Sequence, residues 1–193
     1  MLVSIVITNY NKGKYLPFLF KILELTLQPE GEIIVIDDGS TQQFDLDFLK
    51  KSQFQIYYNR INKGIGYVRN YALTLCKGKY IAFIDGDDFI STDYILTVLE
   101  LAKLDYDIIH FPSMEYSLNP NVYLEFDMYQ LWSCLYNLEF IKKYNIHFNT
   151  ASRISEDYYF NKRLLRYNPR IYNYTNHLPI YFYNLYSENG LTH

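Results

Sequence analysis

The sequence predicts an α/β protein with a mostly parallel sheet flanked by helices, and three observations support this prediction. Short, nearly continuous apolar runs recur between residues 2 and 111. Segments in which apolar residues have helical spacing separate these runs. Turn-forming residues such as Asp, Gly, Ser and Asn follow several of them. Strands that alternate with helices indicate a parallel sheet, because consecutive parallel strands need a crossover connection.

The apolar runs are expected to be strands. The first, at 2–8, is almost uninterrupted by polar residues, which is typical of a strand that is covered on both faces. The second is "EIIVID", after which "DGST" has the composition of a turn or a helix cap. The expected strands are 2–8, 32–37, 56–59, 79–85 and 107–111.

Helices are expected between these strands. In the first, over 14–27, apolar residues recur every three or four positions, and Pro29 and Gly31 end the pattern. The loop "NKGIG" leads into a second helix that ends at Gly78. In the third, over 91–104, Ser91 or Thr92 is the expected cap.

The second half of the chain has a weaker pattern. Residues 112–126 have the composition of a loop or an irregular hairpin, and helical stretches are expected at 129–144 and 155–165. A tyrosine-rich segment with β character, "RIYNYTNHLPIYFYNLY", follows them. No linker separates this half from the first, so we expect a single domain over 1–193.

Charge and cysteine content restrict the function classes. A formal net charge of −3 gives no overall basic field, which argues against a nucleic-acid binder. Cys76 and Cys134 lack the spacing of a disulfide framework or a zinc site. The first apolar run has no basic region before it and is shorter than a signal sequence or a membrane span requires. We therefore expect a cytoplasmic protein.

Acidic residues gather where two predicted strands end. Asp37 and Asp38 follow the second strand, and Asp85, Asp87 and Asp88 follow the fourth. In an open α/β sheet the carboxyl ends of the strands meet at one edge, where ligands bind. Carboxylates crowded at that edge repel one another unless a cation lies between them. Oxygen ligands suit Mg²⁺ or Mn²⁺, which often bridge to the phosphates of a substrate.

Each of these groups also has a structural interpretation. An aspartate after a strand is commonly a helix cap or a turn residue, which explains Asp37 and Asp38 about as well as a ligand role does. The "DGDD" stretch is harder to explain in this way, because one turn rarely needs three carboxylates. Tyr10 could be one more aromatic of a tyrosine-rich chain, and Arg69 a solvated helix residue.

Four motifs in this order resemble the family 2 glycosyltransferases, enzymes of the GT-A fold that move a sugar from a nucleotide-diphosphate donor to an acceptor hydroxyl. The motifs are "VSIVITNYNKGKYL", "EIIVIDDGST", "NKGIGYVRNYAL" and "GKYIAFIDGDDFI". The resemblance covers 2–111 and continues weakly to the end. It implies a Rossmann-like sheet with a nucleotide-sugar-binding half at 1–111 and a smaller acceptor-binding half at 112–193.

The resemblance also implies a donor site. Asp87, the second aspartate of the D-x-D element, is expected to hold a divalent metal, Mn²⁺ or Mg²⁺. The nucleotide-binding residues that it implies are Thr8, Tyr10 against the base, Asp38 reading the base, Arg69 near the base and phosphates, and Asp85 toward the ribose.

The acceptor side is implied by "LWSCLYNLEFIKKYNIHF" followed by "SEDYYFNKRLL". Asp157 is the expected catalytic base, although an acidic pair in a first helical turn is also ordinary dipole chemistry. The chain departs from the family where Cys134 replaces a lysine that often follows the tryptophan. His177 and His193 are further candidate metal ligands.

The expected function is inverting transfer from a UDP-sugar to a saccharide or a lipid-linked saccharide in bacterial surface polysaccharide synthesis. A lipid-linked acceptor implies peripheral contact with the inner face of the cell membrane. One alternative is a nucleotidyltransferase, although "TNYNKGKY" is poor in the glycine such enzymes show after the first strand. The other is a non-catalytic or truncated domain that only binds a sugar nucleotide.

Overall fold

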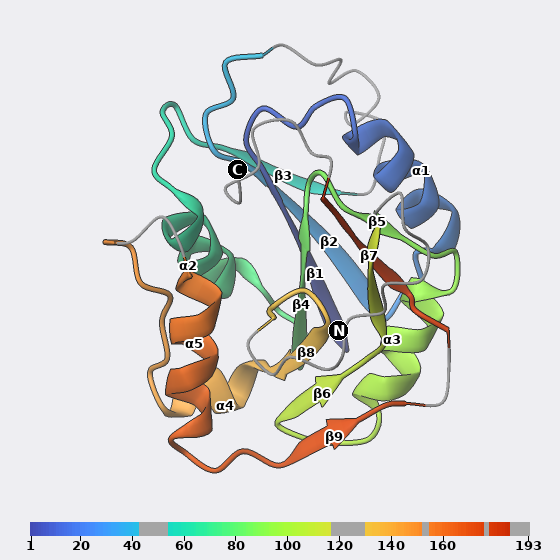
Figure 1. Ribbon diagram of the computed structural model, residues 1–193, viewed down its shortest axis with the longest axis vertical. Helices are drawn as coiled ribbons and strands as arrows, with labels where there is room; N and C mark the ends of the chain where they lie inside the picture. Colours follow the sequence, from blue (N-terminus) through green and yellow to red (C-terminus); the bar gives the residue numbers. More distant parts are fainter. Residues whose placement is uncertain (43–53, 117–129, 152–154, 176–177, 186–193) are drawn as a thin grey trace.

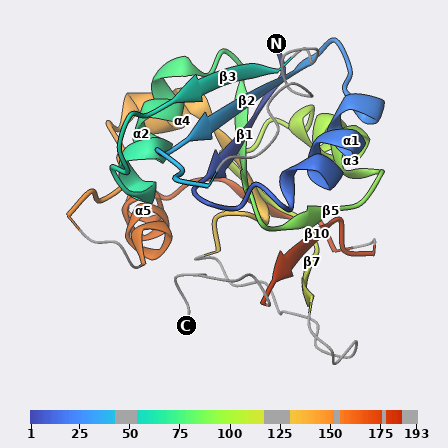
Figure 2. The ribbon, with the colours of Figure 1, turned by 90° about the horizontal axis from the view of Figure 1, so that it is seen from above.

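A computed structural model describes residues 1–42, 54–116, 130–151, 155–175 and 178–185. Within them the chain forms a seven-stranded sheet in the order β3-β2-β1-β4-β8-β6-β9 and a three-stranded sheet in the order β5-β10-β7 (Figure 1). Helices cover both faces of the larger sheet, with α1 and α3 on one side and α2, α4 and α5 on the other (Figure 2). The expected α/β fold with a mostly parallel sheet is confirmed.

The larger sheet is parallel at its centre. β1 pairs in parallel with both β2 and β4, and β2 with β3. β8 runs antiparallel between β4 and β6, and β9 pairs in parallel with β6. The bounds are β1 Val3–Asn9, β2 Gly31–Asp37, β3 Gln55–Tyr58, β4 Tyr80–Asp85, β6 Ile108–His110, β8 Cys134–Asn137 and β9 Ile171–Asn173.

The register of the central strands sets the position of the acidic residues. Asn9 lies opposite Asp37 on β2, and Thr8 lies opposite Asp85 on β4. The carboxyl ends of three neighbouring parallel strands therefore meet at one edge of the sheet. The topology places the two acidic groups of the sequence side by side, as the rule for ligand sites in open α/β sheets predicts.

Alternating side chains of the sheet pack into two hydrophobic cores, one on each face of the sheet. Ile5 and Ile7 of β1 pack on the face covered by α1 and α3, and Val6 packs on the face covered by α2, α4 and α5. Burial on both faces explains why the strands are continuous apolar runs. The helices are α1 Leu16–Thr26, α2 Ile65–Leu75, α3 Tyr94–Ala102, α4 Leu138–Lys143 and α5 Glu156–Leu165.

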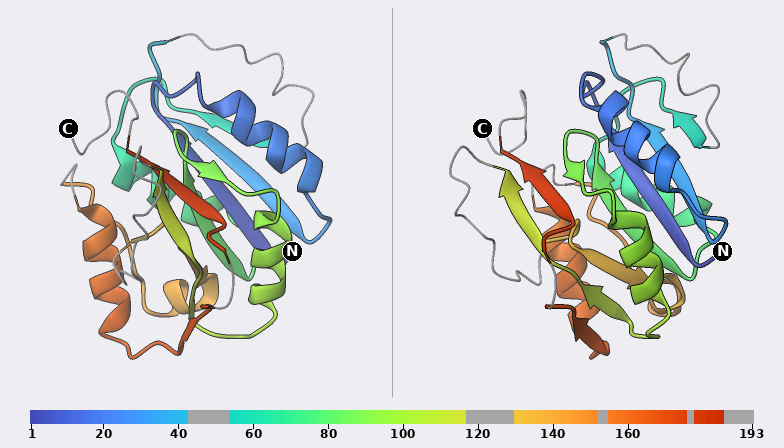
Figure 3. Two further views of the ribbon diagram at one scale, coloured as in Figure 1. Left: turned by 45° about the vertical axis from the view of Figure 1, so that its right-hand side comes forward. Right: turned by 90° about the vertical axis from the view of Figure 1, so that its right-hand side faces the viewer.

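The small sheet extends the core on the α1–α3 face. Its strands are β5 Phe89–Ile90, β7 Ser113–Tyr116 and β10 Tyr181–Asn184, and β10 lies between the other two (Figure 3). Ile90 and Tyr181 are buried in the same hydrophobic core as the residues of α1 and α3. Because β5 follows β4 after a three-residue turn, this sheet meets the edge where the acidic residues gather.

The prediction of a helix over 129–144 is wrong for its first part. Residues 134–137 form strand β8, and a helix begins only at Leu138. All four residues of β8 are buried, so the strand lacks the alternation of a half-buried strand. Leu131, Leu135 and Leu138 then also fit a helical spacing, which is why the pattern is misleading.

Most other elements agree with the sequence. The predicted helix at 155–165 corresponds to α5, and β9 and β10 lie in the tyrosine-rich segment. The predicted irregular segment 112–126 falls largely outside the described residues, and its described beginning contains β7. Among the described residues, no helix has the length and apolar character to cross a membrane.

Candidate active site

The turn after β4 holds three carboxylates in three different environments. Asp85 accepts hydrogen bonds from Thr8 Oγ1 at 2.9 Å and from Arg69 Nη2 at 2.9 and 3.2 Å. Asp87 forms an ion pair with Lys12 at 2.8 Å. Asp88 is only 1% exposed, and burial, together with the charges of Asp85 and Asp87, raises its pKa well above the ordinary value. Each of the three carboxyl groups therefore has its own partners, although the charges of Asp85 and Asp87 still act on Asp88.

Gly86 lets this turn cross the end of β1. Its amide donates to the carbonyl oxygen of Thr8 at 2.8 Å. A Cβ at this position would lie 2.8 Å from that same oxygen and 3.2 Å from Asn9 Oδ1, which is too close for any larger residue without a shift. The glycine of the "DGD" stretch thus keeps Asp85 and Asp87 against β1.

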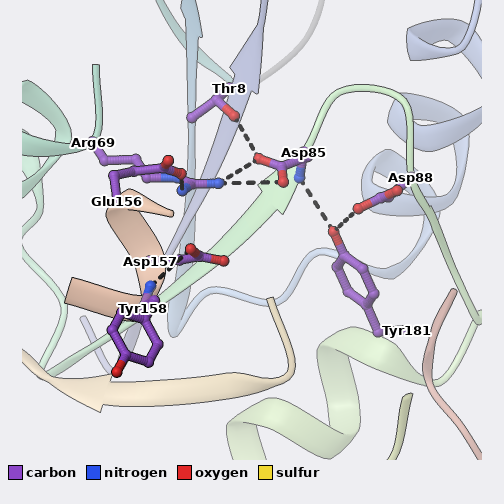
Figure 4. Close-up of polar contacts among 8 residues, drawn as sticks. All are labelled: Thr8, Arg69, Asp85, Asp88, Glu156, Asp157, Tyr158 and Tyr181. Carbon is purple, nitrogen blue, oxygen red and sulfur yellow. Dashed lines mark hydrogen bonds and ion pairs between the residues drawn. The ribbon is translucent and has the colours of Figure 1, made fainter. Parts of the chain in front are cut away.

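Arg69 joins the strand end to helix α5. Its guanidinium donates to Asp85 through Nη2 and to Glu156 through Nη1, and the side chain is 4% exposed (Figure 4). Burial alone would lower the pKa of Arg69, but the charges of Asp85 and Glu156 raise it above the ordinary value. A planar fork suits this double contact, because its nitrogens point in fixed directions.

Two acids open α5 beside this guanidinium. Asp157 Oδ1 accepts the amide of Tyr158 at 2.7 Å, and Figure 4 shows its carboxyl group near those of Asp85 and Glu156. Burial raises the pKa of Asp157, against the opposing effects of the Tyr158 amide and the Arg69 charge. Burial also raises the pKa of Glu156, although the charge of Arg69 opposes it. Asp157 is half-buried, whereas Glu156 is buried.

Asp38 anchors the loop that leads into α2. Its carboxylate accepts the amide of Gly64 at 2.8 Å, the amide of Lys63 at 3.0 and 3.1 Å, and Asn59 Nδ2 at 2.7 Å. Gly64 is the N-cap of α2, has a φ of 92° and offers no side chain. A carboxylate from a distant part of the chain therefore satisfies the amides just before the helix, where its negative charge also suits the helix N-terminus.

Asp37 holds the preceding turn together. It accepts the amide of Ser40 at 2.8 Å and the hydroxyl of Ser40 at 2.7 Å. The Nδ2 of buried Asn9 donates to Asp37 at 2.5 Å and to Ser40 Oγ at 3.2 Å. This network ties the ends of β1 and β2 to one another, as expected from the turn chemistry of "DGST".

Helix α2 also fixes the loop that precedes α5. The side-chain amide of Asn70 donates to the carbonyl of Phe148 at 3.0 Å and accepts the Phe148 amide at 2.8 Å. A Cβ on Gly66 would lie 2.3 Å from the carbonyl oxygen of Asn149, so the loop touches the helix backbone at this point. The α5 acids reach the strand end because α2 carries both this loop and Arg69.

The family model described as Glycosyl transferase family 2 matches residues 4–177, which is most of the chain. This chain belongs to glycosyl transferase family 2. The residues that match the family model include the acids at the strand ends and the acids of α5.

Two curated relatives of this family 2 chain are glycosyltransferase GlyG of Streptococcus pneumoniae and chondroitin synthase of Escherichia coli. GlyG is 31% identical over 114 residues, which cover 56% of this chain and 38% of GlyG. Chondroitin synthase is 32% identical over 128 residues, which cover 63% of this chain and 18% of that protein. The chain thus spans less than half of either relative.

The solved structures confirm the fold. TarS 1–349 of S. aureus in complex with UDP-GlcNAc has a TM-score of 0.82 at 22% identity, with 98% of this chain and 60% of that chain covered. The family 2 chain therefore has the GT-A fold.

The structure brings four of the residues proposed for the site into one cluster, namely Thr8, Arg69, Asp85 and Asp157. Arg69 is buried, so its interpretation as a solvated helix residue is wrong. Tyr10 is 42% exposed near the end of β1, and Asp38 lies at the start of α2 with its carboxylate turned to backbone amides.

Three positions in the second half have other outcomes. Cys134 is completely buried in β8, so its side chain belongs to the core of the family 2 domain. Its sulfur donates to the carbonyl of Gln130 at 3.3 Å. His177 and His193 lie outside the described residues.

The sequence did not identify several residues that contact the acidic turn. Lys12 lies in the first motif, just after β1, and this position could have indicated that it lies near the acidic residues at the strand ends. Glu156, which reaches the turn only through Arg69, was visible as the partner of Asp157. Tyr181 and Asn184 had no signal, because they come from a tyrosine-rich segment more than 90 residues after the turn.

The chemistry of the donor set fits a divalent cation only in part. Within the described ranges, no three His, Cys, Asp or Glu side chains converge in a way that could hold a metal ion. Asp87 supplies one carboxylate at the strand end, where Lys12 pairs with it. Mg²⁺ needs only one or two protein carboxylates when phosphate oxygens and water complete its coordination. Asp87 therefore fits a cation that arrives with a diphosphate.

Proposed function

We propose that this chain transfers a sugar from a nucleotide-diphosphate donor, a UDP-sugar in the first instance, to an acceptor hydroxyl with inversion of configuration. The observation that carries the proposal is the double contact of Arg69 with Asp85 at the strand end and with Glu156 beside Asp157. This double contact connects the strand end, where the family resemblance places the donor, with α5, where the resemblance places the catalytic base. TarS, which has the same fold, is known in complex with UDP and with UDP-GlcNAc.

The donor would lie along the carboxyl ends of β1, β2 and β4. The exposed ring of Tyr10 offers a stacking surface for the base, and Thr8 and Asp85 would face the ribose. Asp38 would act at the base end, where it also orders the loop before α2. These roles come from the family resemblance, and the hydrogen bond between Thr8 and Asp85 supports the part that concerns the ribose.

The reaction would form one bond and break another at the same carbon. The acceptor oxygen attacks the anomeric carbon from the face opposite the diphosphate, and the bond to the diphosphate oxygen breaks with its electron pair. Asp157 takes the acceptor proton, for which the raised pKa of its half-buried carboxyl is suited. A divalent cation held by Asp87 would supply positive charge that stabilises the departing diphosphate. Arg69 keeps the α5 acids close to the donor side.

The acceptor is proposed from the relatives. Chondroitin synthase is named for a polysaccharide, and we extend this to a saccharide or a lipid-linked saccharide of a bacterial surface polysaccharide. We also propose a cytoplasmic location, from which a lipid-linked acceptor would bring the protein to the inner face of the cell membrane.

Calorimetry with UDP, in the presence and absence of Mn²⁺, tests the donor site. We expect UDP to bind, and to bind more tightly with Mn²⁺. A screen of nucleotide sugars for slow hydrolysis then identifies the donor without knowledge of the acceptor, with release of UDP as the readout. Absence of UDP binding under both conditions would contradict the proposal.

These assays, together with a measurement of pyrophosphate release, separate the alternatives. A nucleotidyltransferase would consume a nucleoside triphosphate together with a sugar phosphate and release pyrophosphate. A non-catalytic module would bind UDP with no hydrolysis or transfer for any donor tested. Either outcome replaces the proposed reaction.

A further inference from the structure

We propose that strand β10 positions the acidic turn, with Tyr181 and Asn184 as the positioning residues. The inference rests on the proposed function, because it assigns these residues to the metal and diphosphate part of the same site. It assigns to the strand at 181–184 a role that the division into a donor half and an acceptor half does not include.

Hydrogen bonds from both residues reach the turn at three of its positions. The Tyr181 hydroxyl accepts the amide of Asp85 at 3.2 Å and donates to the carboxylate of Asp88 (Figure 4). The amide of Asn184 donates to Asp88 Oδ1 at 2.8 Å. Its side-chain Nδ2 donates to the carbonyl oxygen of Asp87 at 2.9 Å. The strand thus holds the backbone on both sides of the Asp87 carboxylate.

The turn needs such support because its three carboxylates repel one another. Thr8 and Arg69 hold the side chain of Asp85, but they do not fix where the following residues point. Asp88 is turned inward, away from the strand end, and β10 supplies two donors to its carboxylate. With Asp88 held inside, Asp87 is the carboxylate of the turn that pairs with Lys12, in the segment that follows β1.

Aromatic packing makes β10 a rigid support. Tyr181 is completely buried, and its ring stacks with Trp132 at 5.1 Å between centroids and 15° between planes. Tyr183, two residues along the same strand, also stacks with Trp132, at 5.4 Å and 9°. A ligand-holding group needs its supporting side chains locked by packing of this kind. Trp132 lies in the segment that precedes β8, so the second half of the chain holds the turn through two of its parts.

The test compares hydroxyl and amide deletions with a matched control. Tyr181→Phe and Asn184→Ala remove contacts to the turn. Tyr94→Phe is the control, because Tyr94 is also completely buried and packs near Tyr181, but its hydroxyl has no partner among the described residues. The affinity for UDP is measured by calorimetry with and without Mn²⁺, and the melting temperature of each variant is recorded.

We expect Mn²⁺ to strengthen UDP binding by a smaller factor in Tyr181→Phe and Asn184→Ala than in the wild type and in Tyr94→Phe. The loss should be about tenfold in Tyr181→Phe, the effect of one hydrogen bond to a charged group. It should be smaller in Asn184→Ala, which removes only the bond from Nδ2 to the neutral carbonyl of Asp87. Binding of UDP without metal should change little. A general loss of structure would instead weaken both measurements, so their ratio reports positioning.

Hydrogen exchange of the free protein gives a second test of the proposal that needs no ligand. We expect the amides of Asp85, Asp88 and Asn184 to exchange faster in Tyr181→Phe than in Tyr94→Phe. Variants that keep the full Mn²⁺ effect, or exchange rates equal to those of the control, would overturn the proposal. A wild-type protein that does not bind UDP would overturn the proposed function instead, and the exchange data would still decide the structural role of β10.

Discussion

Arg69 on α2 donates a hydrogen bond to Glu156 on α5, which lies 87 residues later in the chain. Both side chains are buried, and the other terminal nitrogen of Arg69 contacts Asp85. One cation thus balances carboxylates from two elements that would otherwise repel each other at the sheet edge. A lysine could not span both, because its ammonium is a single point charge.

Replacement of Arg69 by Met should destabilise the protein strongly. It leaves two carboxylates without their buried partner, a change that costs about 3–5 kcal/mol in comparable ion pairs. Urea unfolding measures the loss of unfolding free energy. Arg170→Met is the control, because Arg170 pairs with Asp105 and Asp107 at the surface and surface pairs contribute about 0–1 kcal/mol. An equal effect of both substitutions would contradict the structural role of Arg69.

Glu156→Gln combined with Arg69→Met should cost less than the sum of the two single changes. Residues in direct contact have interaction energies of about 0.5–3 kcal/mol, because the second change removes a partner that is already unpaired. A double-mutant cycle from the same unfolding experiments measures this coupling. Additive effects would mean that the Arg69–Glu156 contact has no net influence on stability.

Asp157→Asn should abolish most of the transfer activity while UDP still binds. Loss of a general base typically costs about 10²–10⁴-fold in rate. Donor hydrolysis or transfer gives the rate, and calorimetry gives the UDP affinity. Glu139→Gln is a suitable control, because Glu139 is likewise an acid in a first helical turn, on α4. Unchanged turnover in Asp157→Asn would remove Asp157 from the base role.

The acid limb of the kcat/KM profile should lie above the ordinary aspartate value. The base works only when deprotonated, so activity rises as the pH passes the pKa of Asp157. Burial raises that pKa above 3.8. In Asp85→Asn the limb should move to lower pH, because the negative charge of Asp85 raises the pKa of Asp157. A limb that does not move would show that a different group controls it.

Asp38→Asn should reduce the stability of the protein even without a ligand. The substitution places an amide group, a donor, where one carboxylate oxygen now accepts the amides of Lys63 and Gly64. Loss of a cap interaction costs about 0.5–2 kcal/mol. Asp93→Asn is the control, because Asp93 is the N-cap of α3 and makes no side-chain cap bond. If Asp38 served only to recognise a base, thermal unfolding of the two variants would be alike.

Gly66→Ala should disturb the loop before α5. The added Cβ would lie 2.3 Å from the carbonyl oxygen of Asn149, so the loop must move. Overpacking of this kind costs about 1–3 kcal/mol, and displacement of α5 should also lower kcat. Gly31→Ala is the control, because its nearest neighbour is the Leu27 side chain at 3.4 Å. Equal melting temperatures and rates for both variants would contradict the proposed contact.

The sequence was sufficient for the parallel core of the fold. β1, β2 and β4 are covered on both faces, so they are continuous apolar runs that need no partner information to be recognised. The same burial explains why a helix was predicted where β8 lies. Complete burial removed the alternation of apolar and polar residues that distinguishes a strand from a helix. Its partners, β4 and β6, precede it in the chain, and no local pattern records that pairing.

The candidate site also has a part that the sequence could predict and a part that it could not. The positions of Asp85, Asp87 and Asp38 at one edge of the sheet could be predicted, because they lie at or just after strand ends and the sheet brings such ends together. The contacts around them could not be predicted: Arg69 was expected near the donor, but its contact with Glu156 depends on the docking of α5 on α2. Tyr181 was hidden among the 22 tyrosines of the chain, whose spacing does not distinguish a buried hydroxyl from a surface one.

The antiparallel insertion of β8 sets the order in which the sheet can fold during synthesis on the ribosome. Strands β1 to β4 can pair as soon as they emerge, since each has a neighbour made before it or shortly after it. β6 pairs with β8 and β9 and has to wait for both of them. Until residues 134–137 leave the exit tunnel, a nascent chain has unpaired backbone on β4 and on β6. The interval is when the polypeptide is most exposed to aggregation and to chaperones.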